Sequence, residues 1–273
     1  MGESRRLFSA GTAWRGRWQR LSLLTDGARP DTTTRVTWLQ TDLLYCDLRV
    51  PADRPAFGGC RSLLEIDDQG LWHLAEQQGF AGHLESAGDL CFWHRHIDFQ
   101  PPGRLPDAAA VRVIGDRLVE TGVFQTYVEE WRRCEGSDDD MIAAKLLIRG
   151  AAGEAAIRQG FLLAQGDAFM FALERRAPPE RRPTLFENAF VRRERAALLE
   201  ALDFEISLGT RRGGRFPWEV TLSTLPYLQG RSLLTERGWT AGPSDFAEID
   251  RDVLRGRDHE RVEYRRGPKF RWQ

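Results

Sequence analysis

The stretch from residue 80 to residue 133 alternates short runs of aromatic and β-branched residues with signals for tight turns. The dipeptide Gly-Asp separates two such runs at residues 88–89, and two more at residues 115–116. Glycine supplies the positive φ that a tight hairpin needs, and aspartate can hydrogen-bond its own backbone in the turn. We therefore expect an antiparallel meander of strands here, which directs the chain towards a β-sheet fold.

Strand-like runs continue on both sides of this meander, so the whole chain is predicted to be all-β. The further runs are residues 36–40, 43–50, 141–149, 155–164 and 168–175. The polar, acidic segment 134–140 is the best candidate boundary in the 273 residues. It predicts an N-terminal barrel lobe, 1–136, and a C-terminal barrel lobe, 137–273. One large elaborated barrel is the alternative.

Two helices are expected among these strands. Thr184 followed by Glu187 has the spacing of a capping box, and apolar residues recur with helical spacing after it. This pattern predicts one helix over residues 184–201. Residues 71–78 favour a short helix, with Gly79 as its C-terminal stop.

Composition argues against a polyanionic partner. The chain has 39 Lys and Arg against 40 Asp and Glu, so no net basic field attracts nucleic acid or an anionic membrane. No apolar run reaches the length of a membrane span, and the N-terminus has no signal-peptide core. The four cysteines form no Cys-x-x-Cys pair, which favours reduced thiols over a zinc ribbon. We therefore expect a cytoplasmic protein without nucleic-acid or membrane partners.

Several short motifs in the first half resemble a known family. They are Trp38, Tyr45-Cys-Asp-Leu-Arg-Val-Pro51, His96-Ile-Asp98, Glu120-Thr-Gly122 and Tyr127-Val-Glu-Glu-Trp131. Over residues 35–135 the chain resembles the fungal Hri1 family and its bacterial relatives. The resemblance implies an antiparallel calycin or lipocalin-like β-barrel, in two similar lobes. It brings no established catalytic residues.

Polar and aromatic residues alternate along three of the predicted strands, and alternate side chains of a strand share a face. The predicted ligand-binding residues are Tyr45, Asp47, Arg49, Phe92, Tyr127 and Trp131. The predicted catalytic residues, if the protein is an enzyme, are His94, His96, Asp98 and Glu129. Because small closed barrels can hold a ligand, we expect these side chains to face an interior cavity.

The alternative is ordinary inside-out alternation, in which these polar faces meet solvent. The opposite faces, Trp93/Ile97/Phe99 and Cys46/Leu48/Val50, would then form the core. A mixed arrangement, with salt bridges that support loops, is a third interpretation. In each case we expect the large aromatic residues of the strand-like runs to be mostly buried: Trp38, Trp93, Trp131, Phe169, Phe171 and Trp218.

The two histidines of residues 94–96 suggest two kinds of chemistry, metal binding and acid–base catalysis. His94 and His96 could bind a metal with Asp98 or Glu129 as third ligand, but this spacing alone is weak evidence, and no metal or cofactor is predicted. An imidazole oriented by a carboxylate could act as a general acid or base near neutral pH. No nucleophile-elbow or phosphate-loop motif occurs.

Three functions stay open at this point. The first is binding of a small organic ligand in a partly polar barrel cavity, without chemistry. The second is an enzyme of the cyclase, lyase or isomerase type that uses His, Asp and Glu acid–base chemistry inside the barrel. The third is an interaction protein whose barrels present loops to a partner.

Overall fold

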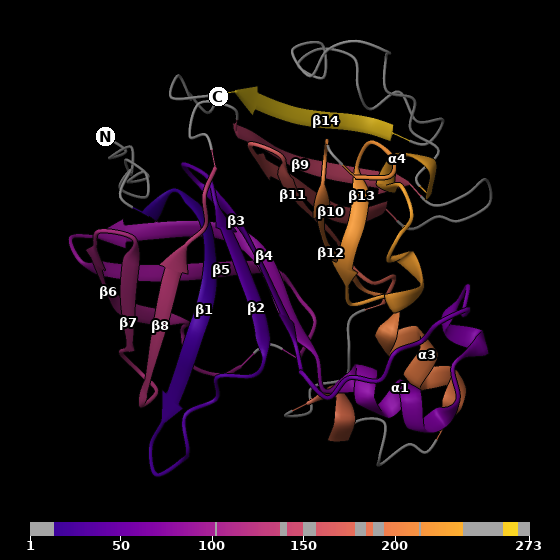
Figure 1. Ribbon diagram of the computed structural model, residues 1–273, viewed down its shortest axis with the longest axis horizontal. Helices are drawn as coiled ribbons and strands as arrows, with labels where there is room; N and C mark the ends of the chain where they lie inside the picture. Colours follow the sequence, from indigo (N-terminus) through magenta and orange to yellow (C-terminus); the bar gives the residue numbers. More distant parts are fainter. Residues whose placement is uncertain are drawn as a thin grey trace, which may run out of the picture.

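The structure is a computed structural model, and it describes residues 14–101, 103–136, 141–149, 157–177, 184–187, 194–212, 214–236 and 259–266. An eight-stranded closed barrel lies beside a six-stranded sheet, with short helices at the far end of that sheet (Figure 1). Every strand pairing is antiparallel. The predicted all-β, calycin-like barrel fold is confirmed.

The barrel is an up-and-down meander, in which each strand pairs with the next and β8 pairs back with β1. Its strands are β1 Gly16–Thr25, β2 Arg35–Gln40, β3 Leu44–Val50, β4 Gln78–Ala87, β5 Leu90–Asp98, β6 Ala108–Ile114, β7 Arg117–Gly122 and β8 Tyr127–Arg133. The predicted tight turns are present: Gly88 has φ 64° between β4 and β5, and Gly115 has φ 63° between β6 and β7. Positive φ is the reason that glycine is needed at both turns.

The second sheet has the strand order β13-β12-β11-β10-β9-β14. Its strands are β9 Met141–Arg149, β10 Ile157–Gln165, β11 Ala168–Leu173, β12 Glu205–Thr210, β13 Glu219–Ser223 and β14 His259–Arg266. In the part of the chain that the structure describes, this sheet does not close. Whether the second half forms a barrel lobe similar to the first stays a prediction. The chain does pass from barrel to sheet within residues 134–140, but the division into lobes 1–136 and 137–273 stays a prediction.

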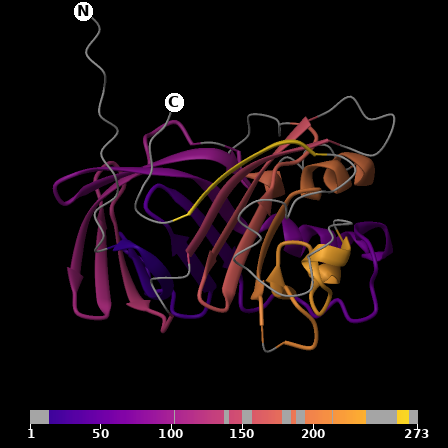
Figure 2. The same ribbon diagram turned by 90° about the horizontal axis from the view of Figure 1, so that it is seen from above.

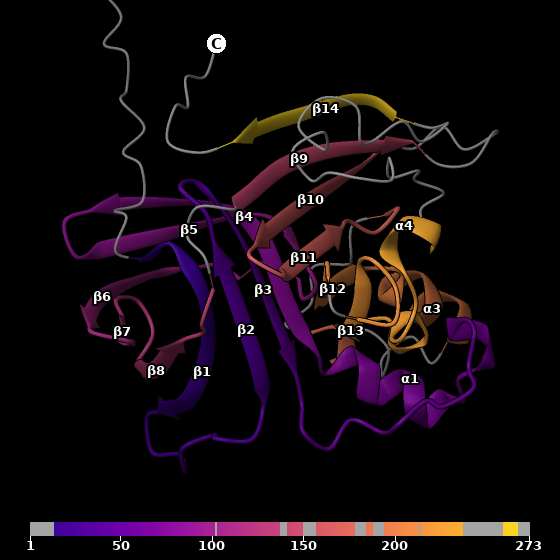
Figure 3. The same cartoon turned by 45° about the horizontal axis from the view of Figure 1, so that its top comes forward.

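The barrel and the second sheet share a hydrophobic core. Figures 2 and 3 show the sheet alongside β3 and β4, and β3 contacts β10, β11 and β12. The outward-facing residues Cys46, Leu48 and Val50 are fully buried in this shared core. A separate cluster, which includes Trp18, Trp38 and Trp131, fills the inside of the barrel. Both faces of β3 are therefore buried.

The six aromatic residues that were expected to be buried are indeed buried. Relative exposures are 2% for Trp38, 8% for Trp93, 1% for Trp131, 0% for Phe169 and Phe171, and 1% for Trp218. The three tryptophans of the first half lie inside the barrel, and the other three residues lie in the shared core.

The helices differ from the sequence expectation. Helix α1 spans Asp68–Ala75, and the side chain of Asp67 caps it by accepting from the Gly70 N–H at 2.7 Å. It ends before Gly79, which belongs to β4 instead. A Cβ atom on Gly79 would lie 2.8 Å from the carbonyl oxygen of Asp47. This glycine therefore serves close packing of strands, and its prediction as a helix stop is wrong.

The predicted helix over residues 184–201 is not one continuous helix. The capping box is present, because Glu187 N–H donates to Thr184 Oγ1 at 3.1 Å and Thr184 N–H donates to the Glu187 carboxylate at 3.2 Å. However, Glu194 is extended, with φ −100° and ψ 111°, and helix α3 begins after it at Arg195–Leu202. Residues 188–193 lie outside the described residues.

The remaining helical elements are short: the 3-10 turns Leu63–Glu65 and Pro226–Leu228, and helix α4, Leu233–Glu236. None of the helices described has the length and hydrophobicity required to cross a membrane.

Candidate functional site

The inside of the barrel contains a cavity of about 250 Å³. Its apolar wall is formed by Trp38, Phe80, Trp93 and Trp131. Its polar wall is formed by Asp47, Arg49, Arg95, Asp107, Glu120, Tyr127 and Glu129. The exposed residues Thr25, Gln78, Gln125 and Thr126 also line it, so the cavity opens at the end of the barrel where β1 ends and β8 begins.

Strand alternation brings most of the predicted ligand-binding residues to this cavity. Asp47 and Arg49 of β3, and Tyr127 and Trp131 of β8, all line it, as does the predicted catalytic residue Glu129. The interior orientation expected for these five residues is confirmed. Their roles in binding or catalysis stay predictions.

Tyr45 and Phe92 do not line the cavity, although both were predicted as ligand-binding residues. Tyr45 lies deeper in the barrel interior, where it is fully buried and its ring centroid is 6.0 Å from that of Phe80. Phe92 is half-buried on the opposite face of β5 from Trp93. Tyr45 can therefore support the cavity wall from behind, whereas Phe92 is not part of that wall.

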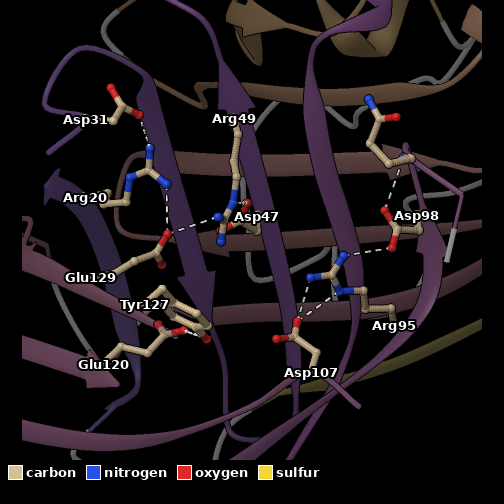
Figure 4. Close-up of polar contacts among 11 residues, drawn as sticks. Arg20, Asp31, Asp47, Arg49, Arg95, Asp98, Asp107, Glu120, Tyr127 and Glu129 are labelled. Carbon is tan, nitrogen blue, oxygen red and sulfur yellow. Dashed lines mark hydrogen bonds and ion pairs between the residues drawn. The ribbon is translucent and has the colours of Figure 1, made fainter. Parts of the chain in front are cut away.

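One ion-pair network crosses the polar wall of the cavity and centres on Glu129 (Figure 4). Glu129 Oε1 accepts hydrogen bonds from Arg20 at 2.8 Å and from Arg49 at 3.1 Å. Arg20 also donates to Asp31 at 2.7 Å, and Arg49 also donates to Asp47 at 2.8 Å. Each guanidinium group therefore bridges two carboxylates from different strands or loops.

A second network surrounds Arg95 on the neighbouring part of the wall (Figure 4). Its guanidinium donates to Asp98 at 2.9 Å and to Asp107 at 2.7 Å. The same group lies over the ring of Phe80, 3.6 Å from the centroid, which is a cation–π contact. Arg95 is therefore held on three sides by protein groups.

Glu120 and Glu129 are direct cross-strand partners on β7 and β8. Both are buried, with relative exposures of 5% and 2%. Burial and the neighbouring Glu129 carboxylate raise the pKa of Glu120 well above its ordinary value. Glu120 Oε1 also accepts a hydrogen bond from the Tyr127 hydroxyl at 2.8 Å. The two glutamates therefore form a buried carboxyl pair in which the protonated form of Glu120 is favoured.

Burial also raises the pKa of Asp47, although the adjacent Arg49 acts in the opposite direction. The effect on Arg49 is reversed: burial lowers the pKa, but Asp47 and Glu129 raise it well above the usual arginine value. The wall thus combines permanently charged guanidinium groups with carboxyl groups that can exchange protons.

Two buried polar atoms of the cavity wall have no hydrogen-bond partner among the described residues. They are Oε2 of Glu129, an acceptor, and Nε1 of Trp131, a donor. The hydroxyl of Tyr45, deeper inside the barrel, is in the same situation. A buried polar atom without a partner costs about 1–3 kcal/mol, so such atoms mark positions where a bound molecule would add stability.

The structure corrects the expectation that His94 and His96 face the cavity. Both are exposed on the outer side of the barrel. The expected shared face with Asp98 is also wrong, because a register shift between Ala81 and Gly82 lets strand β5 accommodate one extra residue. A β-bulge of this kind reverses the alternation, so Asp98 points to the side of Arg95 while the histidines do not.

The histidines form a cluster of their own at the junction with the second sheet. His83 Nδ1 lies 2.7 Å from His96 Nε2, and the ring of His83 stacks on that of His94 at 4.5 Å. Burial, Lys145 and the other histidines lower the pKa of His96 to about 4. The described residues contain no group of His, Cys, Asp or Glu side chains arranged to hold a metal ion.

Sequence reasoning missed five charged residues of the site. Four belong to the two networks, Arg20, Asp31, Arg95 and Asp107, and the fifth, Glu120, lines the cavity. Glu120 could have been found, because it alternates with Leu118 on a predicted strand and stands in one of the family motifs. Arg95 lies on the inner face of β5 together with Trp93, a face that the alternative of inside-out alternation would make apolar core.

Comparisons with known proteins add little to this description. No family model matches the chain, and no curated protein matches it. One solved structure is similar, that of the uncharacterized protein YLR301w from Saccharomyces cerevisiae. The similarity covers 91% of this chain and 96% of the yeast chain, at 12% sequence identity and a TM-score of 0.49. This level of similarity carries no functional argument.

Proposed function

We propose that this protein binds a small organic ligand inside its barrel. The observation that supports this proposal most directly is the barrel cavity, whose wall combines three tryptophans with the unpartnered Glu129 Oε2 and Trp131 Nε1 atoms. Binding sites for small molecules are concave and mostly apolar, with a few placed polar groups that fix orientation. A volume of about 250 Å³ lies just below the usual range for drug-sized ligands, which indicates a small occupant.

The cytoplasmic location and the resemblance to the Hri1 family belong to the same proposal. All four cysteines are free thiols, and Cys46 and Cys91 are fully buried as small apolar residues. Free thiols suit a reducing compartment. The near-zero net charge supports the absence of a nucleic-acid or membrane partner.

Acid–base catalysis in the same cavity is the second candidate. The observation that favours it is the Glu120–Glu129 pair, because one member can hold a proton while the other accepts one. The catalytic role expected for His94 and His96 loses its support, since both lie outside the cavity. An isomerase or lyase here would use Glu120 and Glu129 instead.

Ligand-observed NMR with a library of small aromatic compounds tests the binding proposal. A Thr126→Trp variant places bulk at the mouth of the cavity, and Thr121→Trp places the same bulk at an exposed position of β7. We expect compounds that bind the wild type to lose binding in Thr126→Trp and to keep it in Thr121→Trp. Binding that survives Thr126→Trp unchanged would show that the cavity is not the site. Conversion of a bound compound into product would favour the enzyme.

A further inference from the structure

We propose that the ligand is an organic cation: an ammonium or amidinium group on a small planar apolar body. This inference rests on the proposed ligand-binding function and names the class of molecule that the cavity selects. The charge of the wall, the unpartnered acceptor and the tryptophan faces each support it.

The charged groups of the cavity wall are unbalanced in favour of acid. The described lining contains four carboxyl groups, on Asp47, Asp107, Glu120 and Glu129, and two guanidinium groups, on Arg49 and Arg95. Both guanidinium groups are already bonded to carboxylates of the protein. Among the described lining residues, the wall therefore offers an anionic ligand no free cation, and such a ligand would meet like charge.

Glu129 provides the most direct recognition element. Its Oε1 atom accepts from Arg20 and Arg49, whereas its buried Oε2 atom accepts no hydrogen bond from the described residues. A charged N–H donor of a ligand would complete this carboxylate with a short, charge-assisted hydrogen bond. A neutral apolar ligand would leave the acceptor buried without a partner, which is costly.

The aromatic wall suits the rest of such a ligand. The ring centroid of Trp38 lies 5.7 Å from that of Trp131 and 6.0 Å from that of Trp93, both in edge-on arrangements. Tryptophan faces attract cations and stack on planar groups. The unpartnered Nε1–H of Trp131 would donate to an oxygen or nitrogen acceptor on the ligand body. The preferred occupant is thus an aromatic compound that carries an ammonium or amidinium group and one acceptor atom.

The Glu120–Glu129 pair lets the cavity accept a cation without a net burial of charge. The charged and titratable groups that face Glu120 are Glu129 and Tyr127 from β8, Arg49 from β3, and Asp107. An incoming ammonium group would favour the ionised form of Glu120, so a proton on Glu120 would leave as the cation binds. The ionised Glu120 carboxylate then balances the positive charge of the bound cation.

Three matched probes test the proposal on the full-length protein by ligand-observed NMR at pH 7. They are 2-phenylethylamine as cation, 2-phenylethanol as neutral analogue and 3-phenylpropanoate as anion, each with two methylenes between the ring and the polar group. We expect the amine to bind at least about tenfold more tightly than the alcohol, and the carboxylate not to saturate the site. The Thr126→Trp variant should abolish binding of the amine.

Variants of the carboxyl pair show which atoms recognise the cation. Glu129→Gln should weaken the amine about tenfold and the alcohol less than about twofold. Glu130→Gln is the matched control, because Glu130 is the next residue of β8 and is exposed. It should change neither affinity. If Glu129→Gln does not fold, Glu120→Gln takes its place, and the same selective loss of the amine is expected.

The outcomes separate this inference from the proposed function. If the alcohol or the carboxylate binds as tightly as the amine, and Thr126→Trp blocks it, the cavity binds ligands but does not select cations. If no probe saturates a folded wild-type protein, the ligand-binding proposal fails together with the inference. If Glu129→Gln and Glu120→Gln both leave the amine affinity unchanged, the cation is recognised elsewhere and the inference is overturned.

Discussion

Replacement of Glu120 by glutamine should stabilise the protein, and more strongly as the pH rises. In the folded protein, burial and Glu129 raise the pKa of Glu120. In the unfolded chain, the carboxyl group has its ordinary pKa near 4.5. Glutamine mimics the protonated form in shape and can still accept the hydrogen bond from Tyr127. The substitution therefore removes the cost of ionisation and keeps the local contacts.

The magnitude follows from proton linkage. Above pH 4.5 the unfolded wild type has released the proton of Glu120, whereas the folded protein keeps it up to the raised pKa, so the folded state binds more protons. Wild-type stability then decreases by about 1.4 kcal/mol per pH unit, up to the raised pKa. In Glu120→Gln this contribution is absent. The advantage of the variant should be near zero below pH 4.5 and grow through the neutral range.

Urea unfolding followed by tryptophan fluorescence at several pH values between 4 and 8 measures this difference. The slopes of the free energy of unfolding against pH are compared between variant and wild type, which cancels any effect of the amide that does not depend on pH. The Glu130→Gln variant controls for the loss of one exposed carboxylate. A difference between Glu120→Gln and wild type that does not change with pH would refute the reasoning. It would show that Glu120 ionises normally in the fold and that water solvates the pair.

Other predictions concern packing and the histidine cluster. Trp131→Ala should lower the free energy of unfolding by about 3–5 kcal/mol in urea, because Trp131 is 1% exposed. Gly82→Ala should lower the free energy of unfolding by on the order of 3 kcal/mol or prevent folding, since the new Cβ would lie 1.9 Å from the carbonyl oxygen of His94. Arg175→Ala should cost about 2–3 kcal/mol, because buried Arg175 donates to three carbonyl oxygens between β5 and α3. His96 should titrate near pH 4 by NMR. Because this folded pKa is below the unfolded value of 6.5, stability is lost as the pH falls between 6.5 and 4, by about 1 kcal/mol after solvent screening.

The barrel could be predicted because its signals are local. Turn residues such as Gly88 and Gly115 mark hairpins directly, and neighbouring strands in a meander pair with each other. Alternation also assigned Asp47, Arg49 and Glu129 to one side of their strands, and that side proved to be the interior. Which side faces inwards was the uncertain step, because on β3 both faces are buried.

The histidine assignment failed because of one extra residue. A strict period of two holds along β5 until the bulge opposite Gly82, and a shift by one residue exchanges the two faces. No residue among 94–98 is of a type that predicts this bulge. Gly82 is a weak signal, since glycine inside a strand often marks a bulge or a close backbone approach. It is distant in sequence from the residues that it displaces.

The packing of the second sheet against the barrel explains how the barrel can have ion pairs in its interior. Buried ion pairs such as Arg20 with Glu129 add little net stability, because the loss of hydration offsets most of their attraction. Besides the tryptophan cluster inside the barrel, stabilising apolar burial lies on the outer face of β3, which packs against β10, β11 and β12 in a core rich in leucine and phenylalanine. Since that outer core supports the strands, the inner face is free to carry carboxylates and an unpartnered acceptor. The second sheet can therefore act as the support that permits a polar binding cavity, and this role accounts for its close packing against the cavity-forming strands.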